Sequence, residues 1–388
     1  MRKIHIAAII GTRPEAIKLV PIILAARERS EQFHIKVVRT GQHRELVDQL
    51  MEEFGLQADV DLNVMQPNQD PIHVLIEGVR GLSTFVIREK PDWVLVQGDT
   101  MTTVAGALAG FYNHTRVGHV EAGLRTGDRS RPFPEEVNRS LAARLADVHF
   151  APTEQARDNL LREGIACADI LVTGNTVVDA LLQALARKPV ATECSAYILV
   201  TVHRRENHGV ALHHICEGLV ALLERHSDVH AIIPMHPHPS VRDVLMARVG
   251  RHPRIVLTEP LGYTEFIGTL NGAAMVLTDS GGVQEECAVL GKPMLILREN
   301  SERPEALDAD TTFLVGTNSR RILAFGSRLL NWPLTNRENA PLANVFGDGN
   351  ASTRILDALL ARTFAGDGRQ IIVANPKPSR ILRVGPDK

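Results

Sequence analysis

The sequence predicts an α/β protein with two doubly wound parallel-sheet domains that face each other across a central cleft. Three observations support this. Short apolar, β-branched runs alternate with longer helical patterns, and polar residues gather where the apolar runs end. The chain's 388 residues also exceed the size that one hydrophobic core usually supports.

The first half of the chain supplies the strands expected in the first sheet. Each apolar run is followed by a stretch with helical spacing, as expected where helices connect parallel strands. The predicted strands are Ile4 to Ile10, Ile35 to Val38, Trp93 to Val96, Val117 to Val120 and Val148 to Ala151.

The same rhythm restarts in the second half and predicts a second sheet, with a boundary near Gly174. Its expected strands are Ile170 to Val172, Ile198 to Val202, His230 to Ile233, Ile255 to Leu257, Met275 to Leu277 and Met294 to Leu297. We therefore expect domains at residues 1–172 and 173–350, a helix at about 351–362, and an accessory or poorly ordered tail at 363–388.

Composition narrows the classes of function. The 43 basic and 45 acidic side chains nearly balance and form no long basic tract, so we expect no nucleic-acid or membrane partner. The four cysteines form no CxxC pair, and no HxxxH or HxH set with a carboxylate makes a convincing metal site, so no metal site is expected. The first apolar run is too short for a signal or membrane segment, which favours a cytoplasmic enzyme.

Acidic side chains follow neighbouring predicted strands. Asp99 and Glu121 come directly after two apolar runs, and Glu135 lies in the next loop, with Arg139 one helical turn later. Because the carboxyl ends of strands in an open parallel sheet line the ligand crevice, we expect these groups to lie together.

Two turns have the features of phosphate sites. Gly11 to Lys18 follows the first strand and opens a helix, and Arg13 and Lys18 would add positive charge to its N-terminus. This segment lacks the GxGxxG pattern, which argues against a dinucleotide-binding oxidoreductase. A solvated first turn is the simpler alternative.

The second turn, Thr278 to Glu286, brings Ser280 and two glycines to a helix start, with Glu286 spaced to accept ribose hydroxyls. An ordinary helix cap is the alternative. Arg204 and Arg205, which follow His203 at a strand end, and Arg303 after another strand would suit a diphosphate.

Eight blocks in order give the chain a specific resemblance over about residues 3 to 362. The chain resembles the non-hydrolysing UDP-N-acetylglucosamine 2-epimerase family. The blocks are GTRPEAIK (11–18), TGQHRE (40–45), QGDT (97–100), HVEAGLR (119–125), PFPEEVNR (132–139), HRREN (203–207), TDSGGVQEE (278–286) and ERPEA (302–306).

The resemblance implies a GT-B arrangement of two Rossmann-like domains with the site in the cleft, the C-terminal helix packed back on the first domain, and a homodimer. It implies that UDP contacts Arg13, Lys18, Phe266 near the uracil, Ser280, Gly282, Glu286 and Arg303. Asp99, Glu121, Glu135 and His203 would surround the sugar, and Arg139 would orient the acids. Gln42, His43 and Arg44 match part of a second, regulatory substrate site.

The implied reaction is reversible inversion of C2 of UDP-N-acetylglucosamine, giving UDP-N-acetylmannosamine for cell-surface polysaccharide. UDP would be eliminated to leave 2-acetamidoglucal and then be added back, with no metal or redox cofactor. The alternatives are a hydrolysing 2-epimerase, a GT-B glycosyltransferase and a UDP-sugar sensor without activity. Three residues depart from the family pattern: Val202 and Asp310 where glycine is usual, and His238 where asparagine is common.

Overall fold

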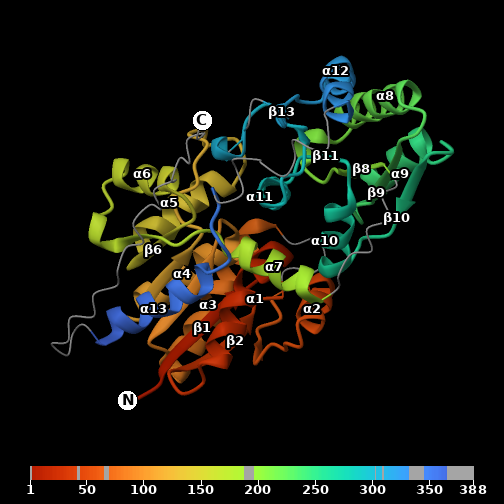
Figure 1. The fold of residues 1–388 in the computed structure, drawn as a ribbon. Coiled ribbons are helices and arrows are strands. Elements are labelled where there is room, and N and C mark those ends of the chain that lie inside the picture. Colours follow the sequence, from red (N-terminus) through yellow and green to blue (C-terminus); the bar gives the residue numbers. More distant parts are fainter. Residues whose placement is uncertain are drawn as a thin grey trace, which may run out of the picture.

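Two parallel sheets, one in each half of the chain, organise the protein (Figure 1). The computed structural model describes residues 2–41, 44–64, 70–187, 196–301, 303–307, 310–331 and 345–364. Both sheets are parallel throughout and carry helices as crossovers, so the predicted α/β class with two doubly wound domains is confirmed.

The first sheet has seven strands in the order β3-β2-β1-β4-β5-β6-β7. They are β1 (Ile4–Ile10), β2 (Phe33–Arg39), β3 (Val60–Asp61), β4 (Trp93–Gln97), β5 (Arg116–Val120), β6 (Val148–Ala151) and β7 (Ile170–Val172). The accompanying helices are α1 (Arg13–Glu28), α2 (Arg44–Glu53), α3 (Pro71–Glu89), α4 (Met101–Tyr112), α5 (Glu135–Leu145) and α6 (Glu154–Arg162), with a 3₁₀ turn at Cys167–Asp169.

The second sheet has six strands in the order β10-β9-β8-β11-β12-β13. They are β8 (Tyr197–Thr201), β9 (His230–Pro234), β10 (Ile255–Thr258), β11 (Met275–Thr278), β12 (Met294–Ile296) and β13 (Thr312–Leu314). Its helices are α8 (Val210–Arg225), α9 (Pro239–Val249), α10 (Tyr263–Gly272), α11 (Gly281–Val289) and α12 (Ser319–Leu330), with 3₁₀ turns at Arg205–Asn207 and Pro304–Ala306.

Every apolar run expected to be a strand is one, with ends that differ by at most two residues. One was assigned to the wrong sheet. Ile170–Val172 pairs with β6 and closes the first sheet instead of opening the second. Its apolar pattern predicts a strand whichever sheet it joins. The connection that precedes the strand decides which strand it pairs with. The short strands β3 and β13 were not predicted.

Central strands are apolar on both faces because helices cover both sides of the sheet. In β1, six of seven residues are buried, and β4 is buried throughout. The polar residues that follow, from Gln97 at the end of β4 onward, therefore lie at the carboxyl edge of the sheet.

Two helices connect the halves of the molecule. Helix α7 (Thr176–Arg187) packs against α1 on one side and against α10 and α11 on the other. Helix α13 (Ala351–Phe364) lies on the first domain against α1, where Figure 1 draws it in blue among the red elements.

The chain crosses between the domains twice, and the two crossings touch. Asn175 N–H donates to the Phe346 carbonyl at 2.7 Å. Gly174 and Gly347 both have positive φ, and a Cβ on either would come within 3.0 Å of the other's Cα. Only glycine fits at both positions.

The domain limits at residues 172, 350 and 362 stay predictions. Helix α13 continues to Phe364, and residues 365–388 of the expected tail lie outside the described part of the chain. Among the helices that the structure describes, none has the length and hydropathy needed to cross a bilayer.

Candidate active site

The three acids expected to act on the sugar lie on adjacent turns of the first domain. Strands β4 and β5 pair with Gln97 opposite Val120, so Asp99 and Glu121 emerge from the same sheet edge. Glu121 has a φ of 63°, a left-handed conformation rare outside glycine and typical of functional turns. Glu135 opens α5 and is electrostatically coupled to Asp99.

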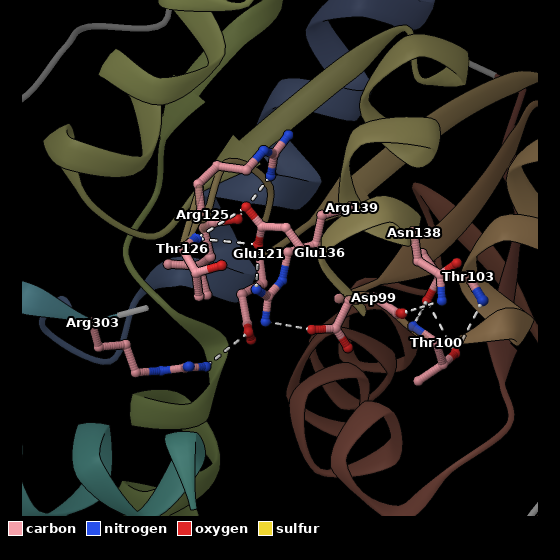
Figure 2. A network of polar contacts seen from close by, with 12 residues as sticks. Asp99, Thr100, Thr103, Glu121, Arg125, Thr126, Glu136, Asn138, Arg139 and Arg303 are labelled. Carbon is pink, nitrogen blue, oxygen red and sulfur yellow. Dashed lines mark hydrogen bonds and ion pairs between the residues drawn. The ribbon is translucent and has the colours of Figure 1, made fainter. Parts of the chain in front are cut away.

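Arg139 holds two acids in place, as Figure 2 shows. Its guanidinium pairs with Asp99 at 2.6 Å and with Glu136 at 3.2 Å. Glu136 also accepts from the backbone N–H groups of Thr126 and Gly127, at 3.0 Å and 2.9 Å. It therefore ties the loop before α5 to the arginine, a role the sequence reasoning missed although Glu136 follows a named residue.

Glu121 joins the two domains. Its buried carboxylate pairs with Lys18 of α1 and with Arg303 of the second domain, at 3.2 Å for the arginine. Gln97 Nε2 donates to the same carboxylate at 2.9 Å. Two cations from opposite domains thus meet at one acid beside Asp99.

A second buried carboxylate, Glu285 on α11, shares the same cations. It accepts from Arg303 Nε at 2.5 Å and from Asn175 Nδ2 at 3.0 Å, and Lys18 Nζ lies 4.0 Å away. Burial raises the pKa of Glu285, and Arg303 and Lys18 oppose that shift. Sequence reasoning selected its neighbour Glu286 and missed this residue.

Glu135 has a different environment from the other two acids. Its Oε2 is buried and has no hydrogen-bond partner within the described residues. Burial raises the pKa of Glu135, and the charge of Asp99 raises it further. This carboxyl therefore holds its proton at a higher pH than an exposed glutamate.

Beneath the first turn of α1, Glu15 connects two loops that carry site residues. Its carboxylate accepts from the backbone N–H groups of Gly11 and Thr12, at 2.9 Å and 2.5 Å, and from the Thr100 hydroxyl at 2.6 Å. Burial raises its pKa to about 6, against these hydrogen bonds. The turn bearing Arg13 is thereby fixed to the turn bearing Asp99.

On the second domain, His203 is paired with a fully buried aspartate. His203 Nδ1 lies 2.7 Å from Asp279 Oδ1, and the backbone N–H of His203 also donates to that carboxylate. Burial would raise the pKa of Asp279, but His203 and the N–H of Arg204 outweigh it and lower the value to about 2. The histidine ring is half-exposed beside His236.

The start of α11 has the open geometry of an anion site. The Ser280 side chain makes no capping hydrogen bond, and a Cβ added to Gly282 would meet no atom within 4 Å. Backbone N–H groups in such a first turn, together with the helix dipole, attract phosphate. Arg303 lies against Gly281, where a Cβ would contact its guanidinium.

The residues expected around the nucleoside lie near this turn. Glu286 accepts from the Tyr263 hydroxyl at 3.0 Å, and burial raises the pKa of Glu286 to about 8. Phe266 is partly buried on α10. Arg13 reaches across from the first domain and donates to the Leu261 carbonyl at 2.9 Å. Tyr263 carried no sequence signal of its own.

The expected second-site residues are only partly described. Gln42 and His43 lie outside the described residues, and Arg44 is described only as the first residue of α2.

None of the three residues that depart from the family pattern belongs to the group of site carboxylates described above. Val202 is buried in the second core, His238 caps α9 by accepting from Ser240 N–H, and Asp310 pairs with Arg328. Across the described ranges, no three His, Cys, Asp or Glu side chains are arranged to hold a metal ion.

Comparison with known proteins finds matches over most of the chain. The family model described as UDP-N-acetylglucosamine 2-epimerase matches residues 25–360. The UDP-N-acetylglucosamine 2-epimerase of Salmonella typhimurium is 46% identical over 368 residues, which cover 91% of this chain and 98% of that protein.

Solved structures agree. The UDP-GlcNAc 2-epimerase of Neisseria meningitidis bound to UDP-GlcNAc is 40% identical with a TM-score of 0.88, over 92% of this chain and 100% of that one. The Methanocaldococcus jannaschii enzyme in complex with UDP-GlcNAc and UDP is 37% identical with a TM-score of 0.82, over 92% and 99%. The two-sheet architecture is thus the GT-B-like one expected.

Proposed function

The chain belongs to the UDP-N-acetylglucosamine 2-epimerase family, and from that premise we propose that it interconverts UDP-N-acetylglucosamine and UDP-N-acetylmannosamine. The enzyme is an isomerase that inverts C2 of the sugar. Hydrolysis and glycosyl transfer use similar nucleotide sugars and are the alternatives that the experiment below separates.

Inversion at C2 needs an indirect route, because no carbonyl acidifies the C2 hydrogen. A base takes the C2 proton, the C–H electron pair forms the C1–C2 double bond, and the C1–O bond breaks to release UDP. The intermediate is 2-acetamidoglucal. Re-addition of UDP at C1, with a proton delivered to the opposite face of C2, gives the other epimer.

One observation carries this proposal: Lys18 and Arg303, from different domains, meet at Glu121 beside the pair Asp99 and Glu135. The elimination needs positive charge where the diphosphate departs and acid or base groups where the proton moves. Both requirements are met at the same place between the domains.

The cations are proposed to bind the departing diphosphate. Glu121 and Glu285 hold Lys18 and Arg303 in fixed positions, so these side chains need little reorganisation when UDP leaves. Arg13, His203 and the N-terminus of α11 would complete the diphosphate site, through Ser280 and the N–H of Gly282. Glu286 would bind the ribose and Phe266 would contact the uracil.

The proton transfers are assigned to Asp99 and Glu135. Arg139 pairs with Asp99 at 2.6 Å and so fixes the position of the carboxylate that is assigned the role of base. The raised pKa of Glu135 suits it to hold the proton that is returned to the other face. In this scheme Glu121 keeps the cations in place next to the reacting carbon.

The test is incubation of the purified protein with UDP-N-acetylglucosamine in D₂O, followed by proton NMR. Deuterium at C2 in both epimers is expected. Free N-acetylmannosamine and UDP as the only products would indicate the hydrolysing enzyme. Turnover that needs an acceptor and leaves C2 unlabelled would indicate a transferase, and UDP-sugar binding without turnover would indicate a sensor.

The assembly is proposed to be a homodimer formed through α3 and α4. These neighbouring helices expose large apolar side chains, which soluble monomers rarely gather on one surface. They are Ile72, Ile76, Ile87, Phe111 and Tyr112, each more than half exposed.

Cellular role and regulation complete the proposal. A cytoplasmic enzyme that supplies N-acetylmannosamine units for cell-surface polysaccharide fits the reaction. Regulation by substrate through Gln42, His43 and Arg44 predicts that UDP-N-acetylmannosamine alone reacts slowly until a trace of the gluco epimer is added. An immediate full rate would exclude this regulation.

A further inference from the structure

Helix α10 begins without a cap from its own domain. Its N-cap residue is Gly262, which has no side chain to accept the first N–H groups, although an α-helix leaves four such groups unpaired. The helix carries Tyr263 and Phe266, so its position sets part of the proposed nucleotide pocket.

The missing acceptor comes from the other domain. Glu53, the last residue of α2, accepts from the backbone N–H groups of Tyr263 and Thr264, at 3.1 Å and 3.0 Å. A carboxylate at this end of a helix satisfies two donors and also interacts favourably with the helix dipole.

Gly262 leaves the space that this contact needs. A Cβ at this residue would lie 2.3 Å from Glu53 Oε1. The backbone of Gly262, with φ −59° and ψ 160°, is open to any residue, so backbone strain does not require glycine here. The close approach of the carboxylate does.

Further contacts hold the end of α2 against α10. The Phe54 and Tyr263 rings lie with centroids 6.2 Å apart. Arg187, at the end of α7, donates to the Glu53 carbonyl at 2.8 Å and covers the Phe54 ring. The end of α2 that carries Glu53 is therefore held by α7 as well as by α10 itself.

The contact leads directly to the nucleotide side of the site. The Tyr263 backbone N–H binds Glu53, and its hydroxyl donates to Glu286 at 3.0 Å. Phe266 follows less than one helical turn later. Arg13 donates to the Leu261 carbonyl just before α10 and interacts electrostatically with both Glu53 and Glu286.

We propose that Glu53 is a positioning residue that caps α10 from across the domain interface and so holds Tyr263, Glu286 and Phe266 in their nucleotide-binding arrangement. The inference rests on the proposed function, because it concerns the affinity of that site for UDP. It makes nucleotide binding dependent on the approach of the two domains.

The test measures UDP binding by titration calorimetry for the wild-type protein and for Glu53→Gln. The glutamine keeps the shape but loses the charge and one acceptor, so we expect affinity to fall about tenfold. KM for the nucleotide sugar should rise more than kcat falls. Glu52→Gln, on the exposed side of the same helix, is the matched control and should bind UDP as the wild type does.

A second variant removes the same contact with different atoms. Gly262→Ala displaces the carboxylate, so it should weaken UDP binding to a similar extent, and the double variant should be no worse than either single one. Equal UDP affinity of Glu53→Gln and wild type, or fully additive losses, would overturn the inference. If the wild-type protein binds no UDP, the proposed function fails and the inference fails with it.

Discussion

Three carboxyl groups on adjacent turns have three different environments. Arg139 pairs with Asp99, two cations from different domains pair with Glu121, and Glu135 has a buried oxygen without a partner in the described residues. Their chemistry therefore differs although their positions in the sequence look equivalent. Cations hold the first two carboxylates in position, and burial, which raises the pKa of Glu135, suits the third to carry a proton.

Replacing Asp99 tests the proposed base. Asp99→Asn keeps the shape and removes the proton acceptor, so kcat should fall by about 10²-fold or more while UDP affinity changes little. The rate of deuterium incorporation at C2 measures this. Asp158→Asn, at an exposed site on α6, is the control and should match the wild type. A loss of less than about tenfold would remove Asp99 from the proton-transfer pair.

The raised pKa of Glu286 predicts that the free energy of unfolding depends on pH. Its pKa is raised from 4.5 to about 8 in the folded protein, chiefly by burial. The folded state thus binds this proton more tightly than the unfolded state, so the contribution is most favourable below about pH 4.5 and is lost as pH rises towards 8.

Glu286→Gln removes this titration and keeps an acceptor for Tyr263. The urea midpoint should therefore fall less between pH 5 and pH 8 than in the wild type, while exposed Glu217→Gln should leave the pH dependence unchanged. Parallel curves for Glu286→Gln and wild type would contradict the assignment.

The sequence predicted single residues better than their partners. His203 could be selected because it follows an apolar run, but Asp279, which holds it, lies 76 positions later. The same applies to Glu285 with Arg303, and to Glu53 with α10. The first two pairs depend on which strands lie side by side in the second sheet, and the third depends on how the two domains meet. No local spacing encodes either.

At the scale of elements, the sequence pattern predicted which segments are strands but not always which sheet a strand joins. Every predicted strand exists, because β-branched apolar runs between helical stretches suit buried parallel strands. The assignment of Ile170–Val172 to the second sheet was wrong, because a strand's sequence does not specify which edge it joins. Strands as short as Val60–Asp61 carry too few residues to form a pattern.

Replacing Val202 tests whether its side chain positions His203, the residue that follows it. Its side chain packs in the second core, while His203 is anchored to Asp279 through both backbone and ring. Val202→Ala should therefore lower unfolding free energy by about 1–2 kcal/mol, measured with urea, and leave the C2 exchange rate within about threefold. Exposed Val210→Ala should cost less than about 0.5 kcal/mol. A large loss of exchange in Val202→Ala would mean that the valine positions the histidine.

At the scale of the whole molecule, the exposed apolar side chains of α3 and α4 predict the assembly. Ile76→Asp places a charge among them and should convert a dimer into a monomer, as measured by light scattering after size exclusion. Met246→Asp alters a similarly exposed apolar residue on α9 and should leave the mass unchanged. A monomeric wild type, or a dimeric Ile76→Asp, would count against this interface.

The two chain crossings at Gly174 and Gly347 have a mechanical consequence. Because both connections run side by side and are joined by the Asn175 hydrogen bond, they form one narrow pivot. Such a pivot favours rotation of one domain relative to the other and opposes translation of the two domains past each other. We therefore expect the site to open by an angular motion whose amplitude grows with distance from the two glycines.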